Sequence, residues 1–123
     1  MVKQASIAVV DDDESVRESL PDLLTVLGFA ARAFASPEEF LVSDFLRETD
    51  CLLLDVAMRG MSGPQLHEEL KRSGSKIPII FITAQSDESL HQRLVQRGAV
   101  ACLLKPFSDT ALMEAINRAL NLG

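Results

Sequence analysis

The sequence has few cysteines, fewer basic than acidic residues, and no apolar run that approaches the length of a membrane span. Twelve lysines and arginines stand against 18 aspartates and glutamates, which gives a formal net charge of −6. A chain of this charge repels phosphates and anionic lipids, so we expect it to bind neither nucleic acid nor a membrane surface directly. Because the N-terminus also lacks a signal-peptide pattern, we expect a cytoplasmic protein.

The two cysteines and the two histidines show no spacing typical of a metal site. Cys51 and Cys102 lie in apolar segments, and we interpret both as reduced thiols in the core. His67 and His91 lie in helical patterns without a partner residue, so we interpret both as surface residues. The chemistry of the chain therefore has to come from other residue types.

Short apolar segments rich in β-branched residues alternate with helical patterns. The segments read SIAVV (6–10), FAARAF (29–34), CLLLD (51–55), IPIIFIT (77–83) and VACLL (100–104). Such continuous runs favour strands that are covered on both faces. Five strands, each followed by a helix, predict an α/β fold with a doubly wound parallel sheet. Since no linker or repeat divides the chain, we expect one domain over residues 1–123.

Local signals predict where several helices begin. Ser36 and Glu39 have the spacing of a capping box. Ser86 and Ser108 are the predicted caps of the last two helices. Pro21 falls inside the first helical pattern, where the loss of a backbone donor predicts a kink.

Carboxylates gather where two of the predicted strands end. Asp11 and Asp12 follow the first strand, and Asp55 ends the third. If these strands are neighbours, three carboxylates meet at one edge of the sheet, and their mutual repulsion calls for a cation. Oxygen ligands of this kind favour Mg²⁺, with Mn²⁺ as an alternative.

A hydroxyl group and an ammonium group end the next two strands. Thr83 closes the fourth strand and Lys105 follows the fifth. Together with a metal held by the acid pair, they form a set that suits a phosphoryl group bound to the lone carboxylate of Asp55.

The acidic run also has a structural interpretation. Acids are stabilised at the first turn of a helix by the backbone dipole, and we favour this interpretation for Asp13 and Glu14. It explains Asp11 and Asp12 less well, because one helix cap does not require three acids.

The chain resembles the receiver domains of response regulators, the CheY-like phosphoacceptor modules of two-component signalling. The resemblance lies in VVDDD (9–13), LLLD (52–55), MSG (61–63), FITA (81–84) and LLKPF (103–107), in the order and at the spacings of the family. It covers essentially the whole chain and implies a flavodoxin-like sheet with strand order 2-1-3-4-5. The segment KPFSDTALMEAINRAL is similar to receivers of FixJ-like DNA-binding regulators.

The resemblance implies a role for each residue of the site. Asp55 corresponds to the phosphoacceptor, Lys105 to the lysine that pairs with phosphoryl oxygens, and Thr83 to the hydroxyl that moves toward them. The Lys105–Pro106 peptide bond is typically cis in the family. The implied metal ligands are Asp11, Asp12, Asp55 and the backbone carbonyl of Ala57.

Several positions depart from the family pattern. Cys102 stands where an aromatic switch residue is usual, so we expect a differently transmitted conformational change, through Phe107 or the fourth helix. Arg59 replaces a usual proline and adds a cation near the site. Ala57 and Gln85 occupy positions that tune dephosphorylation in the family.

The implied partner is a sensor histidine kinase or a phosphotransfer protein that docks near Asp55 along the first helix. Two outputs stay open: a homodimer through the fourth helix, the fifth strand and the fifth helix, or an effector domain after Gly123. The chain is then no enzyme in the ordinary sense, since it acts only on its own phosphorylation and dephosphorylation.

Three other functions are possible for a chain of this architecture, and each makes its own demand on the sequence. A Mg²⁺-dependent phosphatase with an aspartate nucleophile requires Asp-x-Asp-x-Thr after the first strand, where this chain reads DDDES (11–15), and usually a cap domain. A nucleotide- or flavin-binding module requires a Gly- or Ser/Thr-rich phosphate loop at the same place. A receiver that acts by protein contact alone stays open because of Cys102.

Overall fold

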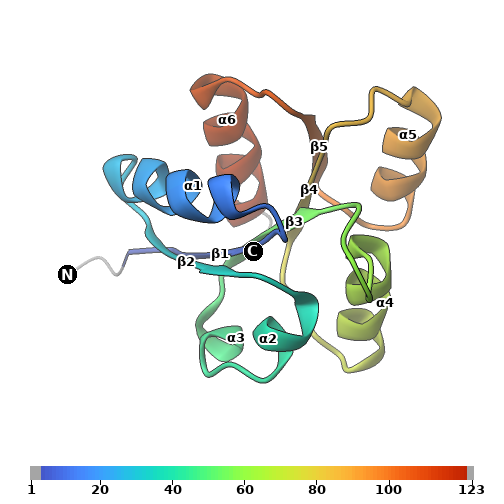
Figure 1. Ribbon diagram of the computed structural model, residues 1–123, viewed down its shortest axis with the longest axis horizontal. Helices are drawn as coiled ribbons and strands as arrows, with labels where there is room; N and C mark the ends of the chain where they lie inside the picture. Colours follow the sequence, from blue (N-terminus) through green and yellow to red (C-terminus); the bar gives the residue numbers. More distant parts are fainter. Residues whose placement is uncertain (1–3, 122–123) are drawn as a thin grey trace.

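Five strands form one parallel sheet in the structure, a computed structural model that describes residues 4–121. The strands are β1 (Ser6–Val10), β2 (Ala30–Phe34), β3 (Cys51–Asp55), β4 (Ile79–Thr83) and β5 (Ala101–Leu104). Their order across the sheet is β2-β1-β3-β4-β5, which confirms the predicted fold and strand order (Figure 1). Strand β4 starts after Pro78 rather than at 77, because proline has no N–H for the ladder.

Helices cover both faces of this sheet (Figure 1). They are α1 (Glu14–Val26), α2 (Pro37–Leu41), α3 (Phe45–Glu48), α4 (Gly63–Arg72), α5 (Glu88–Gln96) and α6 (Asp109–Leu120). Leu24 of α1 and Ile116 of α6 belong to one hydrophobic cluster, on the face of Ile7 and Val9. The cluster on the other face contains residues of α2, α4 and α5. The sheet is therefore buried on both sides, as its continuous apolar strands predict.

Two short helices replace the single helix predicted between β2 and β3. Both the backbone N–H and the hydroxyl of Ser43 donate to the Phe40 carbonyl, at 3.1 and 2.8 Å. These bonds end α2 early, and the chain resumes its helical course only at Phe45. The expectation of one continuous helix here was wrong.

The predicted helix starts are confirmed in part. Ser108 caps α6 as expected, and the Ser36 hydroxyl accepts the Glu39 N–H, although the return bond of a full capping box is not formed. The expectation for Ser86 was wrong, because Asp87 caps α5 instead. One Asp87 carboxylate oxygen accepts the backbone N–H groups of Ser89 and Leu90, at 2.9 and 3.2 Å.

Helix α1 continues through Pro21 to Val26, so the proline does not end it. The hydroxyl of Thr25 donates to the Pro21 carbonyl at 2.9 Å.

None of the helices in the described residues is long and apolar enough to cross a membrane.

The interpretation of His67 as a surface residue was wrong. Its side chain is buried between α4 and β4, with the ring edge-on to Phe81 at a centroid distance of 5.8 Å. Burial, with the charge of Lys71, lowers its pKa below the ordinary value of 6.5. His91 remains partly exposed, and its Nε2 lies 3.0 Å from the Gln85 carbonyl oxygen.

Both cysteines are free thiols. Cys51 is buried in β3, while Cys102 is only half-buried in β5, and strand β4 separates the two. Burial raises the pKa of the Cys102 thiol to about 11, so the thiol stays protonated at neutral pH.

Candidate functional site

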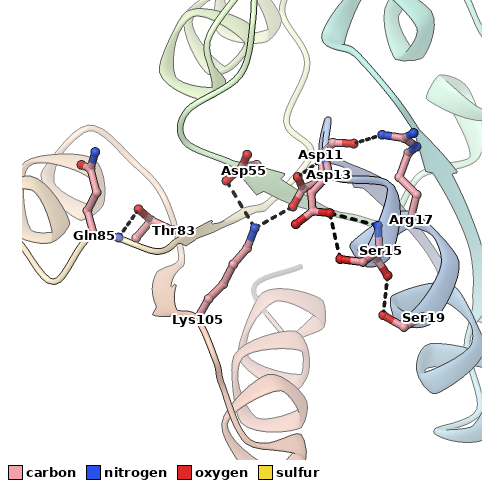
Figure 2. Close-up of polar contacts among 9 residues, drawn as sticks. All are labelled: Asp11, Asp13, Ser15, Arg17, Ser19, Asp55, Thr83, Gln85 and Lys105. Atoms are coloured by element: carbon pink, nitrogen blue, oxygen red, sulfur yellow. Dashed lines mark hydrogen bonds and ion pairs between the residues drawn. The ribbon is translucent and has the colours of Figure 1, made fainter.

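The polar residues picked out by the sequence meet at the carboxyl ends of four strands. Asp55 and Thr83 are the last residues of β3 and β4, while Asp11 and Lys105 directly follow β1 and β5. Because all strands are parallel, these ends share one edge of the sheet (Figure 2).

An ammonium group lies between two carboxylates at this edge. The Nζ atom of Lys105 is 3.0 Å from Asp11 Oδ2 and 3.7 Å from Asp55 Oδ1 (Figure 2). Asp11 is completely buried and Asp55 nearly so, which makes their charges costly without this cation. The second oxygen of Asp11 accepts the Asp13 N–H at 2.9 Å, so the Asp11 side chain is held at both oxygens.

Asp12 completes a cluster of three carboxylates. One oxygen from each of Asp11, Asp12 and Asp55 can be chosen so that all lie within 4.8 Å of one another. Asp12 is exposed, and its Oδ2 accepts the backbone N–H of Arg59 at 3.3 Å. The size of the cluster and its hard oxygen donors fit a divalent cation such as Mg²⁺. Ala57 lies exposed in the loop after β3, two residues beyond Asp55.

The electrostatics of the cluster favour proton or cation uptake. Burial raises the pKa of Asp55 to about 7, and the charges of Asp11 and Asp12 add to this while Lys105 opposes it. For Lys105, burial lowers the pKa, but the hydrogen bond to Asp11 and the charges of Asp55 and Asp11 outweigh it and raise the pKa. A site of this kind gains from any further positive charge.

Thr83 belongs to the same edge but is turned toward another part of it. Its buried hydroxyl oxygen accepts the N–H of Gln85 at 3.0 Å, away from Asp55 (Figure 2). The backbone N–H of Lys105 donates to the Thr83 carbonyl at 2.7 Å, and the Lys105–Pro106 bond is cis. The hydroxyl is thus next to the charged cluster without being part of it.

The family model described as the response regulator receiver domain matches residues 7–117. The chain belongs to this family of receiver domains. The three carboxylates of the cluster and the lysine between Asp11 and Asp55 all lie within the matched residues.

Transcriptional regulatory proteins are among the known proteins similar to this receiver domain. The transcriptional regulatory protein TdiR of Thauera aromatica is 40% identical over 97% of this chain and 52% of its own length. The transcriptional regulatory protein FixJ of Azorhizobium caulinodans is 35% identical over 98% of this chain and 57% of its own length. The chain thus spans about half the length of these curated relatives.

Solved structures agree with the sequence comparisons. The response regulator StyR superposes with a TM-score of 0.88 at 42% identity, over 98% of this chain and 61% of that one. The structure of FixJ-N superposes with a TM-score of 0.86 at 37% identity, over 98% of this chain and 96% of that one.

Two residues that sequence reasoning left without a role support the receiver site. A Cβ atom at Gly63 would clash with the carbonyl oxygen of Asp55 and lie 3.1 Å from the Phe81 ring. The motif MSG marks this glycine, but only the packing of α4 against β3 shows why a side chain is excluded. The other is Arg17, whose Nη1 donates to the Asp11 carbonyl at 3.1 Å. Its place inside a helical pattern gave no signal.

Asp13 and Glu14, the other two acids of the run after β1, stabilise the start of α1 and do not belong to the carboxylate cluster. Asp13 caps α1, and its Oδ1 accepts both the N–H and the hydroxyl of Ser15, at 2.9 and 2.8 Å. These bonds lower the pKa of Asp13. The structural interpretation of Asp13 and Glu14, at the first turn of α1, is therefore confirmed.

Proposed function

We propose that residues 1–123 act as one receiver domain that accepts a phosphoryl group on Asp55 in a Mg²⁺-dependent reaction. One observation carries the proposal: the ammonium of Lys105 lies between Asp11 and Asp55, beside a cluster of three carboxylates at the edge of the sheet. The donor is a phosphohistidine of a sensor histidine kinase or a phosphotransfer protein, consistent with membership of the receiver family.

The proposed step joins Asp55 directly to phosphorus. A carboxylate oxygen of Asp55 attacks the phosphorus atom, and the new O–P bond forms as the bond from phosphorus to the donor nitrogen breaks. The electron pair of the broken bond leaves with the donor. Asp55 must be ionised to attack, and the neighbouring Lys105 ammonium favours this form and pairs with the phosphoryl oxygens.

We assign the metal ligands to Asp11, Asp12, Asp55 and the backbone carbonyl of Ala57. Mg²⁺, or Mn²⁺ in its place, supplies the positive charge that offsets the incoming phosphoryl group when it is bound there. The hydrolysis that removes the phosphoryl group uses water alone, and we assign Ala57 and Gln85 to the control of its rate. No separate substrate is turned over, so the domain is not an enzyme in the usual sense.

We assign Thr83 and Cys102 to the conformational switch. The phosphoryl group brings nearly two negative charges and new acceptor oxygens to the site. On phosphorylation the Thr83 hydroxyl, whose oxygen accepts the Gln85 N–H at 3.0 Å, moves toward Asp55 and donates to a phosphoryl oxygen. Cys102, opposite Phe81 in the β4–β5 pairing, has too little volume to follow as an aromatic ring would.

The relatives indicate what the phosphorylated domain controls. TdiR and FixJ are transcriptional regulators about twice as long as this chain, so we propose that this domain regulates transcription in the cytoplasm through an effector domain. Homodimerisation through α5, β5 and α6 is the alternative route. The net charge of −6 argues against direct binding of nucleic acid by this domain.

Intact mass after incubation with acetyl phosphate and Mg²⁺ tests the proposal. We expect one phosphoryl adduct that requires Mg²⁺, is stable in acid and is lost in base. Asp55→Asn should abolish it, whereas the exposed-site control Asp22→Asn should keep it.

Two other outcomes would overturn the proposal. Mg²⁺ binding without any adduct would indicate a receiver that signals by contact alone. Continuous turnover of a phosphomonoester would indicate the phosphatase instead.

A further inference from the structure

One side chain of α1 holds the backbone of the acidic cluster. Arg17, at the end of the first turn of α1, directs Nη1 to the carbonyl oxygen of Asp11 at 3.1 Å (Figure 2). This carbonyl belongs to the peptide group that joins Asp11 to Asp12. The contact therefore reaches both acids of the pair through their shared backbone.

The Asp11 carbonyl has left the ladder of the sheet. The Asp11 N–H still donates to Phe34 at 3.2 Å, but over residues 4–121 no backbone N–H donates to the Asp11 carbonyl oxygen. Because Asp11 is fully buried, a carbonyl without a partner would be costly there. The guanidinium of Arg17 supplies the partner that the backbone does not.

The two side chains of the acid pair are held very differently. Asp11 is fixed at Oδ1 by the Asp13 N–H and at Oδ2 by Lys105, at 2.9 and 3.0 Å. Asp12 is exposed, and its bond from the Arg59 N–H is long, at 3.3 Å. The direction of the Asp12 side chain therefore depends chiefly on the peptide group from which it starts.

We propose that Arg17 is a positioning residue that fixes the Asp11–Asp12 peptide, so that the Asp12 carboxylate stays within reach of Asp11 and Asp55. This inference rests on the proposed function, because the position of Asp12 matters as that of a metal ligand. Arg17 itself touches neither the metal position nor Asp55. Its effect is exerted through the backbone.

Two substitutions separate position from charge. Arg17→Met keeps the apolar stem and removes the charge, while Arg17→Lys keeps the charge. The lysine Nζ lies one bond nearer the backbone than Nη1, so it does not reproduce the contact. Arg118→Met, at an exposed site in the last turn of α6, is the matched control for the loss of one positive charge.

Three quantities are measured for each protein: the Mg²⁺ dissociation constant at fixed ionic strength, amide hydrogen exchange at Asp12 and Asp13, and the free energy of unfolding. We expect both Arg17 variants to weaken Mg²⁺ binding by about three- to tenfold, the scale seen when a residue supporting a metal ligand is lost. We also expect faster exchange at Asp13, whose N–H donates to Asp11. Arg118→Met should match the wild type in both.

Several results would overturn the inference. Wild-type Mg²⁺ affinity in Arg17→Lys would show that charge alone matters. A loss of stability without faster Asp13 exchange or weaker Mg²⁺ binding would show a merely structural role. If the wild type binds no Mg²⁺, the proposed function fails, and with it the reason to position Asp12, whereas the Asp13 exchange still shows whether Arg17 orders this backbone.

Discussion

The two halves of the functional edge are built differently. The acidic half consists of β1 and β3 with Asp11, Asp12 and Asp55, and every residue of these two strands is buried. The other half, which we call the switch half because it contains Cys102, consists of β5 with α5. None of the β5 residues is fully buried, Leu104 is 41% exposed, and α5 buries only Leu94. Fixed charges thus stand on rigid strands, while the half that we expect to move is loosely packed.

This difference has a physical cause. Carboxylates that share one small site have to be held against their repulsion, so the strands beneath them are packed on both faces and tied by Lys105. Strand β5 lies at the edge of the sheet and pairs with β4 alone. A shift of β5 therefore breaks fewer contacts than a shift of β1 or β3. Substitutions in the acidic half should cost more stability than those in the switch half.

The largest effect is expected at Gly63, where α4 meets the acidic half. In Gly63→Ala the new methyl group would meet the Asp55 carbonyl and Phe81, so the helix has to move away from β3. We expect a loss of about 3 kcal/mol in the free energy of unfolding, typical of overpacking against backbone. Urea unfolding checks this.

The control for Gly63 is Gly74→Ala. Gly74 has a φ of +84° and open space around it, so a methyl group meets only the backbone cost of about 1 kcal/mol. A smaller loss at Gly63 than at Gly74 would contradict the tight packing beneath Asp55.

A smaller loss is expected in Lys105→Met. This change leaves the buried Asp11 carboxylate without its cation, and we expect about 2 kcal/mol of destabilisation in metal-free buffer. Added Mg²⁺ should restore much of this stability, because a cation again lies among the acids. Thermal unfolding with and without Mg²⁺ measures it.

The exposed-site variant Lys76→Met is the control for Lys105. This substitution should leave the thermal stability unchanged both with and without Mg²⁺. An equal Mg²⁺ effect in Lys105→Met and Lys76→Met would show that the ion does not compensate for the missing ammonium.

In the switch half, Cys102→Tyr should change stability by less than about 1 kcal/mol. The side chain borders an open pocket of about 340 Å³ that His91 and Val95 also line, so a ring has room. We expect the variant to spread the conformational change further. NMR shifts induced by a beryllofluoride adduct should centre on α5 and Phe107 in the wild type and extend to position 102 in the variant. Large wild-type shifts centred on Cys102 would contradict this.

The strands and most of the candidate site residues could be predicted from the sequence, for a physical reason. Continuous apolar runs predict the strands, and in a parallel sheet the polar residues that end these strands share one edge. The sequence therefore predicts that Asp11, Asp55, Thr83 and Lys105 lie near one another. The residues that the sequence did not indicate matter because of contacts that form only in the folded chain. Arg17 bonds a backbone carbonyl, which its own helical pattern does not indicate.

The prediction that His67 lies at the surface was wrong for a related reason. A histidine on a helix is polar in the sequence, but α4 turns this one against Phe81. The break between α2 and α3 was missed because it depends on hydrogen bonds of Ser43 to a carbonyl, and serine is common both in helices and at their ends.

The smallest expected effect is a pH dependence carried by His67. Its ring packs on Phe81 of β4, and a Cβ at Gly98, where α5 leads into β5, would lie 3.8 Å from it. Burial lowers the folded-state pKa of His67 below 6.5, so below that pH the unfolded chain takes up the proton more readily than the folded chain. The stability due to the neutral ring is therefore complete above pH 6.5 and is lost as the pH falls toward the folded-state pKa.

Urea unfolding at about pH 7.5 and about pH 5.5 isolates this contribution, since both values bracket the ordinary histidine pKa. The wild type and the control His91→Gln should lose more stability on acidification than His67→Gln, because only they keep the buried ring. Both substitutions leave every carboxylate in place, so a smaller loss in His67→Gln than in His91→Gln reports on the buried ring of His67. Equal losses in the three would mean that the ring accepts its proton without disturbing the packing of α4 against β4 and the α5–β5 turn.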